Sequence, residues 1–417
     1  MGQNKFDVLV LGAGIVGVSA AVHLQQAGLS VALLDRHAEA ACETSFGNTG
    51  IVQSEAVFPY MLPHAPREIL AAALNLDPRV QIRYRALPAL APWLWRYFQA
   101  SRPAVRTRTA LAMRQLVLSS NSEHLALAQA AGAASLLRAG GWIKIYRSPR
   151  GFEMAQQDAQ ETKPFGIASQ MLDRQALTAL EPHLSPSAIG GVHYLEPLTS
   201  SDPAALTRAY AALFVRRGGR FVQGEARSLQ TTGDAWRASS TQGAVEAARA
   251  VVSLGPWSAQ IADMFGYRLP FGVKRGYHMH YGAAPGASLT RPVLDLEKGY
   301  VITPMARGIR LTSGAEFARL DDPPSSRHID RLEPLARELF PLAERRDSQV
   351  WLGQRPCLPD MAPVIGPAPR HKGLWFNFGH QHLGLTLGPV CGRLLAEMMT
   401  GQAPLTDPQA FRLARFE

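Results

Sequence analysis

The segment "KFDVLVLGAGIVGVSAAVHLQQAGLSVALLDR", residues 5–36, decides the fold. A short apolar run ends at Gly12, apolar residues at helical spacing follow from Ile15, and a second apolar run ends at Asp35. This order predicts a strand, a helix and a second strand, which is the βαβ unit of a parallel sheet. We therefore expect an α/β protein, α+β overall, that begins with a Rossmann-like domain.

The turn between the first strand and the helix carries a dinucleotide-binding pattern. Gly12, Gly14 and Gly17 stand in the G-x-G-x-x-G register, and Asp35 ends the following strand. The glycines allow a pyrophosphate to approach the backbone at a helix N-terminus, and the aspartate accepts hydrogen bonds from a ribose diol. An acid at this position disfavours the 2′-phosphate of NADP. Neighbouring residues expected at the same nucleotide are Ile15, Val16 and Arg36.

The continuation of the chain favours FAD over NAD. An NAD dehydrogenase usually continues with further βα units, whereas here a polar loop, "ETSFGNTGIV" (residues 43–52), leads into a helical segment. In a flavoprotein this loop places hydroxyls and backbone amides along the pyrophosphate and the flavin. The alternative is an ordinary surface turn. The candidate cofactor residues in the loop are Thr44, Ser45, Asn48, Thr49 and Gly50.

Composition limits the class of protein. The chain has 417 residues, 47% of them hydrophobic, so it can form two or three domains with sizeable cores. Its formal net charge is +10, but lysine and arginine are dispersed without a run longer than two, which argues against a nucleic-acid surface. Three scattered cysteines exclude a disulfide framework. We expect a cytoplasmic protein, with peripheral contact to the inner face of the membrane as a further option.

The predicted elements suggest two discontinuous domains. Residues 60–138 read as three helical segments inserted after the first βαβ unit, and residues 271–315 read as strands. The aromatic run "WLWRYF" (residues 93–98) within the insertion fits either core packing or a membrane-facing surface. We expect the FAD-binding domain to comprise residues 1–55, 202–265 and 346–417, and the substrate domain residues 56–201 and 266–345.

Five further stretches resemble the FAD-dependent D-amino-acid oxidase/dehydrogenase superfamily when they are taken in order. They are "VVSLGPWS" (251–258), "VKRGYHM" (273–279), "GYVITPMARGIRLTSGAEF" (299–317), "GQRPCLPDMAPVIGP" (353–367) and "FGHQHLGLTLGP" (378–389). With the helical insertion, the chain is most similar to the bacterial D-amino-acid dehydrogenase small-subunit branch. The resemblance covers nearly the whole sequence and implies the two-domain fold described above, with the substrate domain built on a mixed sheet.

The resemblance also implies cofactor contacts in the second half of the chain. Near the adenine we expect Leu254, Gly255, Trp257 and Ala226, although the family commonly has valine at the last position. Around the isoalloxazine we expect Gly379, His380, His382, Leu383, Gly384, Leu385 and Thr386, in a loop before a final helix that Pro389 helps to start. Some relatives attach FAD through a cysteine, but the surroundings of Cys357 do not match that pattern, so we expect noncovalent FAD.

For the substrate, the resemblance implies hydride transfer from Cα to flavin N5 and a protein site that binds a carboxylate. Tyr300 matches the family's carboxylate-binding tyrosine, and Arg355 would lie by the flavin or the substrate carboxylate. Arg310, Tyr277 and His382 are further candidates, and Arg310 could instead be a solvent-facing strand residue. On strand 273–281, alternation separates Arg275 and Tyr277 from Lys274, His278 and His280, and the sequence leaves open which face lines the site.

Two histidine pairs, His278 with His280 and His380 with His382, have spacings that could serve a metal. Neither pair has an acidic or cysteine partner nearby in the sequence, and flavin hydride chemistry needs no metal, so we expect none.

The leading functional expectation is a FAD-dependent D-amino-acid dehydrogenase. It would oxidise a D-amino acid, including a cyclic one such as D-hydroxyproline, to an imine that hydrolyses to a 2-oxo acid and ammonia. Electrons would pass to a quinone or a partner protein, with oxygen as another option. The alternatives are a glycine/sarcosine-type oxidase that makes hydrogen peroxide, and a FAD-binding subunit of a multi-subunit dehydrogenase.

Overall fold

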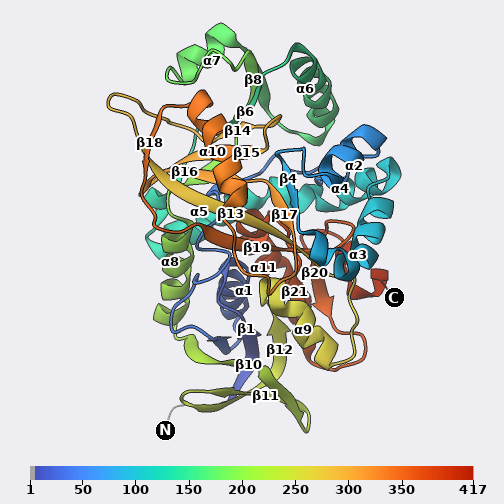
Figure 1. Ribbon diagram of the computed structural model, residues 1–417. Helices are drawn as coiled ribbons and strands as arrows, with labels where there is room; N and C mark the ends of the chain where they lie inside the picture. The colour runs from blue at the N-terminus through green and yellow to red at the C-terminus, as the bar shows by residue number, and fades with distance from the viewer. Residues whose placement is uncertain (1–4, 417) are drawn as a thin grey trace.

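Two large β-sheets organise the protein, for which a computed structural model describes residues 5–416 (Figure 1). The first sheet lies in the lower half of Figure 1, and its central strand β1 pairs in parallel with β2 and β12. Its strands are β1 (Lys5–Leu11), β2 (Val31–Asp35), β10 (Arg220–Thr232), β11 (Ala235–Ser240), β12 (Gly243–Val252), β20 (Val364–Pro367) and β21 (Leu374–Phe378). The central strands are apolar on both faces because each is covered on both sides.

Helices α1 (Ile15–Gln26) and α11 (Gly384–Thr400) pack closely beside this sheet. The approach depends on small residues, since a Cβ on Gly392 would lie 2.8 Å from the backbone nitrogen of Ala20. The first and last parts of the chain are thereby joined into one domain, and α1 also contacts α8 (Pro203–Arg216).

The last helix begins at Gly384, so the expectation that Pro389 helps to start it is wrong. Pro389 lies inside α11, where it cannot donate a hydrogen bond to the carbonyl of Leu385. His124, which is fully buried on α5 (Ser120–Ala131), replaces that donor: its Nε2 lies 2.7 Å from the Leu385 oxygen. Because the freed carbonyl has this partner, the helix continues through the proline.

The second sheet has eleven strands and fills the upper half of the molecule (Figure 1). Its long strand β13 pairs with β16, β17, β18 and β19. The strands are β4 (Val80–Ile82), β6 (Trp142–Tyr146), β7 (Ser169–Asp173), β8 (Gly190–Tyr194), β13 (Gly272–Ala283), β14 (Val293–Asp295), β15 (Tyr300–Met305), β16 (Gly308–Ser313), β17 (Ala315–Phe317), β18 (Leu342–Arg345) and β19 (Trp351–Cys357). Helix α10 (Arg327–Leu339) packs its apolar face on this sheet.

The helical insertion contains four helices rather than three. They are α2 (Pro66–Ala73), α3 (Leu87–Ala100), α4 (Pro103–Leu118) and α5, and the predicted third segment is divided between the last two. The remaining helices are α6 (Pro149–Thr162), α7 (Arg174–Leu180) and α9 (Ser258–Met264). A separate small sheet contains β3 (Ile51–Val52), β5 (Leu137–Arg138) and β9 (Leu198–Ser200). Within residues 5–416, no helix combines the length and apolarity needed to cross a bilayer.

One predicted domain boundary is wrong. The sequence predicts residues 346–357 in the FAD-binding domain, but β19 lies in the second sheet, where it pairs with β13 from Gly272↔Cys357 to His278↔Trp351. The sequence suggests only an apolar strand here, and the choice of sheet depends on a partner far away in the chain. The chain returns to the first sheet at β20.

Candidate active site

The turn between β1 and α1 has the geometry of a nucleotide-binding loop. Gly12 has φ of +103°, and a Cβ there would lie 2.5 Å from the carbonyl oxygen of Ser253. A Cβ on Gly17 would lie 1.8 Å from the oxygen of Gly12. The Asp35 carboxylate accepts hydrogen bonds from the amides of Ala13, at 2.7 Å, and His37, at 2.9 Å, which fix it at the end of β2.

A cavity of about 1530 Å³ starts at this turn and extends between the two sheets to β13, β19 and the helical insertion. Most of the residues predicted at the cofactor line it. They are Gly12, Gly14, Ile15, Val16, Asp35, Arg36, Thr44, Ser45, Asn48, Thr49, Ala226, Leu254, Gly255, Trp257, Arg355, His380, His382, Gly384 and Leu385. Residues from five separated segments of the chain therefore meet around one space.

Five predicted cofactor residues do not line the cavity: Gly17, Gly50, Gly379, Leu383 and Thr386. They support its walls instead. The Gly50 carbonyl accepts from the Ser200 amide at 2.6 Å, and the Thr386 hydroxyl accepts from the Gln53 amide at 2.9 Å.

Beside the end of β2, Arg36 and Trp257 form one wall of the cavity. The Arg36 guanidinium carbon lies 4.2 Å from the centre of the Trp257 ring, within the range of a cation–π contact. Gln260 and Ser253, for which the sequence carries no clear signal of a site, also line the cavity.

The loop 43–52 is held between the two domains. The Thr44 hydroxyl donates to the carbonyl of Gln354 on β19 at 3.0 Å, and the Ile15 amide at the start of α1 donates to the Ser45 hydroxyl at 3.0 Å. Arg310 on β16 donates to the Asn48 carbonyl. Such fixed contacts are expected of a binding loop rather than of an ordinary surface turn.

Orphaned polar atoms mark the centre of the cavity. Asn377, on β21 and fully buried, has no hydrogen-bond partner for either side-chain polar atom within the described chain, and the same holds for Nε2 of His380 and of His382. Burial lowers the pKa of both histidines to about 3, so both are neutral and able to donate or accept. Asn377 was missed, although a polar residue inside the apolar strand "LWFNF" is a recognisable signal.

These atoms require a ligand with its own donors and acceptors, because an unsatisfied buried polar group costs about 1–3 kcal/mol. The pyrimidine edge of a flavin offers such groups. Together with the glycine turn and Asp35, the residues present fit FAD.

At the far end of the cavity, Arg355 on β19 presents an unpaired cation. Its guanidinium donates only to backbone carbonyls, Gly314 at 3.0 Å and Ser313 at 3.3 Å, and no ion pair within residues 5–416 includes it. Burial lowers its pKa from the usual range of arginine. The side chain passes over Gly276, where a Cβ would lie 2.4 Å from Nη2. A partly buried cation that lines a cavity and has no acidic partner is suited to an anionic ligand.

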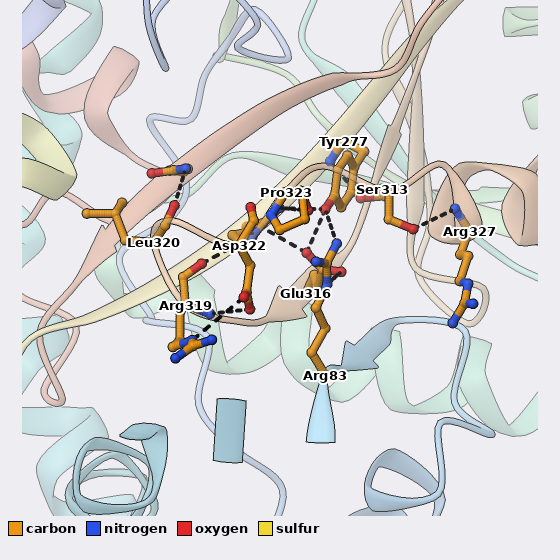
Figure 2. A network of polar contacts seen from close by, with 12 residues as sticks. Arg83, Tyr277, Ser313, Glu316, Arg319, Leu320, Asp322, Pro323 and Arg327 are labelled. Carbon is orange, nitrogen blue, oxygen red and sulfur yellow. Dashed lines mark hydrogen bonds and ion pairs between the residues drawn. The ribbon is translucent and has the colours of Figure 1, made fainter. Parts of the chain in front are cut away.

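The structure also decides which face of β13 meets the cavity. Lys274 and Gly276 line it. Tyr277 also lines it, but its hydroxyl accepts from Arg275, which does not line the cavity. Figure 2 shows Tyr277 and Glu316 in a polar network beside Arg83, and the tyrosine hydroxyl donates to Glu316 at 2.6 Å. Tyr277 is therefore at the cavity wall with its hydroxyl engaged in this network, and its contact with a substrate stays a prediction.

The predictions that Tyr300 and Arg310 contact the substrate are wrong, because neither residue lines the cavity. Tyr300 is fully buried beneath α10, and its hydroxyl donates to the Leu335 carbonyl at 2.9 Å. Arg310 is buried against the loop 43–52 and is not solvent-facing, and its Nε donates to Nε2 of His280 at 3.1 Å.

The fold brings an acidic partner, Asp347, to the pair of His278 and His280, with ligand atoms within 4.8 Å of one another. Both nitrogens of His280 are already engaged, however: Nδ1 lies 2.7 Å from Asp347 and Nε2 accepts from Arg310. The adjacent guanidinium also repels a cation. This cluster therefore reads as a hydrogen-bond network and not as a metal site.

Comparison with known proteins agrees with this geometry. The D-amino-acid oxidase of Bradyrhizobium diazoefficiens is 28% identical over 98% of each chain, and the D-amino acid dehydrogenase of Granulibacter bethesdensis is 30% identical over 98% of this chain and 99% of its own. The crystal structure of glycine oxidase from Geobacillus kaustophilus superposes with a TM-score of 0.75 at 20% identity, covering 99% of each chain. Residues 7–398 match the DAO family, described as FAD dependent oxidoreductase. The chain belongs to this family of FAD-dependent oxidoreductases.

Proposed function

We propose that the protein is a dehydrogenase that oxidises the Cα–N bond of a D-amino acid. The observation that carries the proposal is the unpaired guanidinium of Arg355 in the cavity, beside the orphaned histidines of the C-terminal loop. A planar guanidinium binds a carboxylate with two parallel hydrogen bonds. The curated relatives named D-amino-acid oxidase and D-amino acid dehydrogenase support the D configuration.

FAD, held noncovalently by the glycine turn, Asp35 and the C-terminal loop, supplies the acceptor for the hydride that leaves Cα. The buried Cys357 thiol donates to the Arg355 carbonyl at 3.5 Å, which agrees with a structural role for this cysteine.

The chain itself orients the substrate and controls its charge. Arg355 fixes the carboxylate, and the neutral His382 forms part of the wall beside Tyr60, with ring centres 4.9 Å apart. Arg355 and Lys274 both disfavour a nearby ammonium, so they lower the pKa of the substrate amine and favour the neutral form that can become an imine. The imine then hydrolyses to a 2-oxo acid and ammonia, whereas a cyclic substrate stops at the imine.

We propose electron transfer to a quinone or a protein rather than chiefly to oxygen, with the cavity mouth at the membrane surface. The aromatic run on α3 is divided: Trp93 is buried, whereas Trp95 is 61% exposed. Leu70, Leu74 and Leu76 on and after α2 are also exposed. Trp95 lines the cavity, and the exposed arginines nearby suit anionic lipid.

The central experiment uses the purified holoprotein without oxygen. D-, L- and N-methyl amino acids are added separately, and the absorption band of oxidised flavin is followed. Bleaching by D-amino acids supports the proposal. Bleaching by glycine or sarcosine alone supports the oxidase alternative, and no bleaching by the isolated chain supports a role as a subunit of a larger dehydrogenase. Turnover with a dye compared with turnover with oxygen tests the acceptor.

Membrane contact has its own test. Holoprotein is sedimented with vesicles of anionic or neutral phospholipid, and a Leu74→Glu/Leu76→Glu variant is compared with wild type. Binding to anionic vesicles that the variant loses supports the surface. Equal sedimentation of both proteins overturns it.

A further inference from the structure

A second cation stands beside Arg355 in the same cavity. Lys274 on β13 is the direct cross-strand partner of Arg355 on β19, so the two side chains leave the sheet on the same face. Both line the cavity. Neither takes part in any ion pair within residues 5–416, whereas other arginines such as Arg83 and Arg147 do.

The ammonium of Lys274 is held in a defined position. Its Nζ donates to the Tyr97 hydroxyl at 2.6 Å and lies 4.1 Å from the centre of the same ring. Tyr97 is almost fully buried on α3 and donates its own proton to the Tyr60 carbonyl at 2.6 Å, so its oxygen is oriented to accept from the lysine. The other contact of Nζ is a weak one to the Met361 sulfur at 3.8 Å. The ammonium therefore keeps a proton for a ligand.

The acidic side chains along the cavity do not neutralise these two cations. Asp35 is bound by backbone amides, Glu43 pairs with Arg36, and Asp77 pairs with Arg79. The potential around His382 is positive. Burial is the main cause of the low pKa of His382, and the charges of Arg355, Lys274 and Lys144 lower it further. Two adjacent, partly buried cations repel each other, and a ligand with two negative groups removes this repulsion.

We propose that Lys274 is a specificity-determining residue that selects D-amino acids whose side chain ends in a carboxylate, with D-aspartate and D-glutamate as the substrate class. This inference rests on the proposed function. Arg355 holds the α-carboxylate, and Lys274, one strand away, holds the second carboxylate. Tyr97 is a positioning residue that keeps the ammonium directed at the cavity.

The experiment compares substrates that differ by one charge at nearly constant shape. The value of kcat/KM is measured with an artificial dye for D-glutamate against D-glutamine, and for D-aspartate against D-asparagine. Wild type is expected to prefer the acid by about 10- to 100-fold, the size expected of a hydrogen bond between two ions. In Lys274→Met, which keeps the length of the chain without its charge, the preference should fall to about one. Lys163→Met, at an exposed site after α6, should keep the wild-type preference.

Binding without turnover gives an independent reading. Titration of the holoprotein with glutarate and with butyrate, followed by calorimetry, should show tighter binding of the diacid in wild type and not in Lys274→Met. Tyr97→Phe, which removes the acceptor that positions the ammonium, should lower the preference by an intermediate factor and serves if Lys274→Met fails to retain FAD.

The inference is overturned if wild type uses D-glutamine as well as D-glutamate, or if Lys274→Met lowers kcat/KM equally for both. Reduction of the flavin by D-alanine in the same preparation would show in either case that the proposed function still holds. If no D-amino acid reduces the flavin, the proposed function itself fails.

Discussion

Gly276 lies directly under the guanidinium of Arg355: a Cβ at residue 276 would come within 2.4 Å of Nη2. The two residues are on neighbouring strands, β13 and β19, and the missing side chain of one gives the other its path into the cavity. The position of the guanidinium proposed to bind the carboxylate thus depends on the absence of a side chain at Gly276.

Gly276→Ala should displace Arg355 and lower kcat/KM for a D-amino acid by about 100-fold, because a misplacement of roughly 1 Å has that effect on a reaction. FAD content should stay normal. Gly282→Ala on the same strand is the matched control, since its Cβ would meet the flexible end of Glu344 at 3.0 Å. Normal kinetics in Gly276→Ala would contradict this assignment.

Tyr300 and Arg355 should respond differently to removal of their polar groups. Tyr300→Phe should change kcat/KM less than about threefold, because the hydroxyl is bound to the Leu335 carbonyl beneath α10, and should lower the free energy of unfolding by about 1 kcal/mol. Arg355→Met should lower kcat/KM about 1000-fold, as expected for loss of a charged bidentate contact. A large kinetic defect in Tyr300→Phe would restore that residue to the substrate site.

The hydrogen bond from His124 to the Leu385 carbonyl should stabilise the first turn of α11. His124→Phe should lower the free energy of unfolding by about 1–3 kcal/mol, the cost of an unsatisfied buried carbonyl, as measured by urea denaturation of the holoprotein. Pro389→Ala supplies an amide donor inside the helix. The loss caused by His124→Phe should therefore be smaller in the Pro389→Ala background, and equal losses in both backgrounds would refute the compensation.

Acid should destabilise the protein below neutral pH through its buried histidines. Burial lowers the pKa of His380 to about 3, whereas the pKa of an unfolded histidine is 6.5. The unfolded state thus binds more protons between these values, and the free energy of unfolding falls as the pH falls through 6.5, by up to about 1.4 kcal/mol per pH unit for one such histidine. His380→Gln should show a shallower fall between pH 6.5 and 5, where most carboxylates stay charged. An unchanged slope would mean that His380 titrates in the folded state.

The sequence alone determined the nucleotide half of this protein. Gly12, Gly14 and Asp35 act within one continuous βαβ unit, whose geometry depends on local backbone freedom and on strand and helix periodicity. The resemblance of the later stretches identified the family, and it placed His380, His382 and Arg355 around the cavity that the structure shows.

Only the tertiary structure decided which residues line the end of the cavity proposed for the substrate. Tyr300 stands in a stretch that resembles the family, yet its hydroxyl faces α10. Lys274 became a cavity residue because β13 pairs with β19 in one particular register. Periodicity assigns residues to two faces of a strand without saying which face is covered. That choice depends on packing between segments distant in the chain, because it is their contacts that leave one face free to bind a ligand.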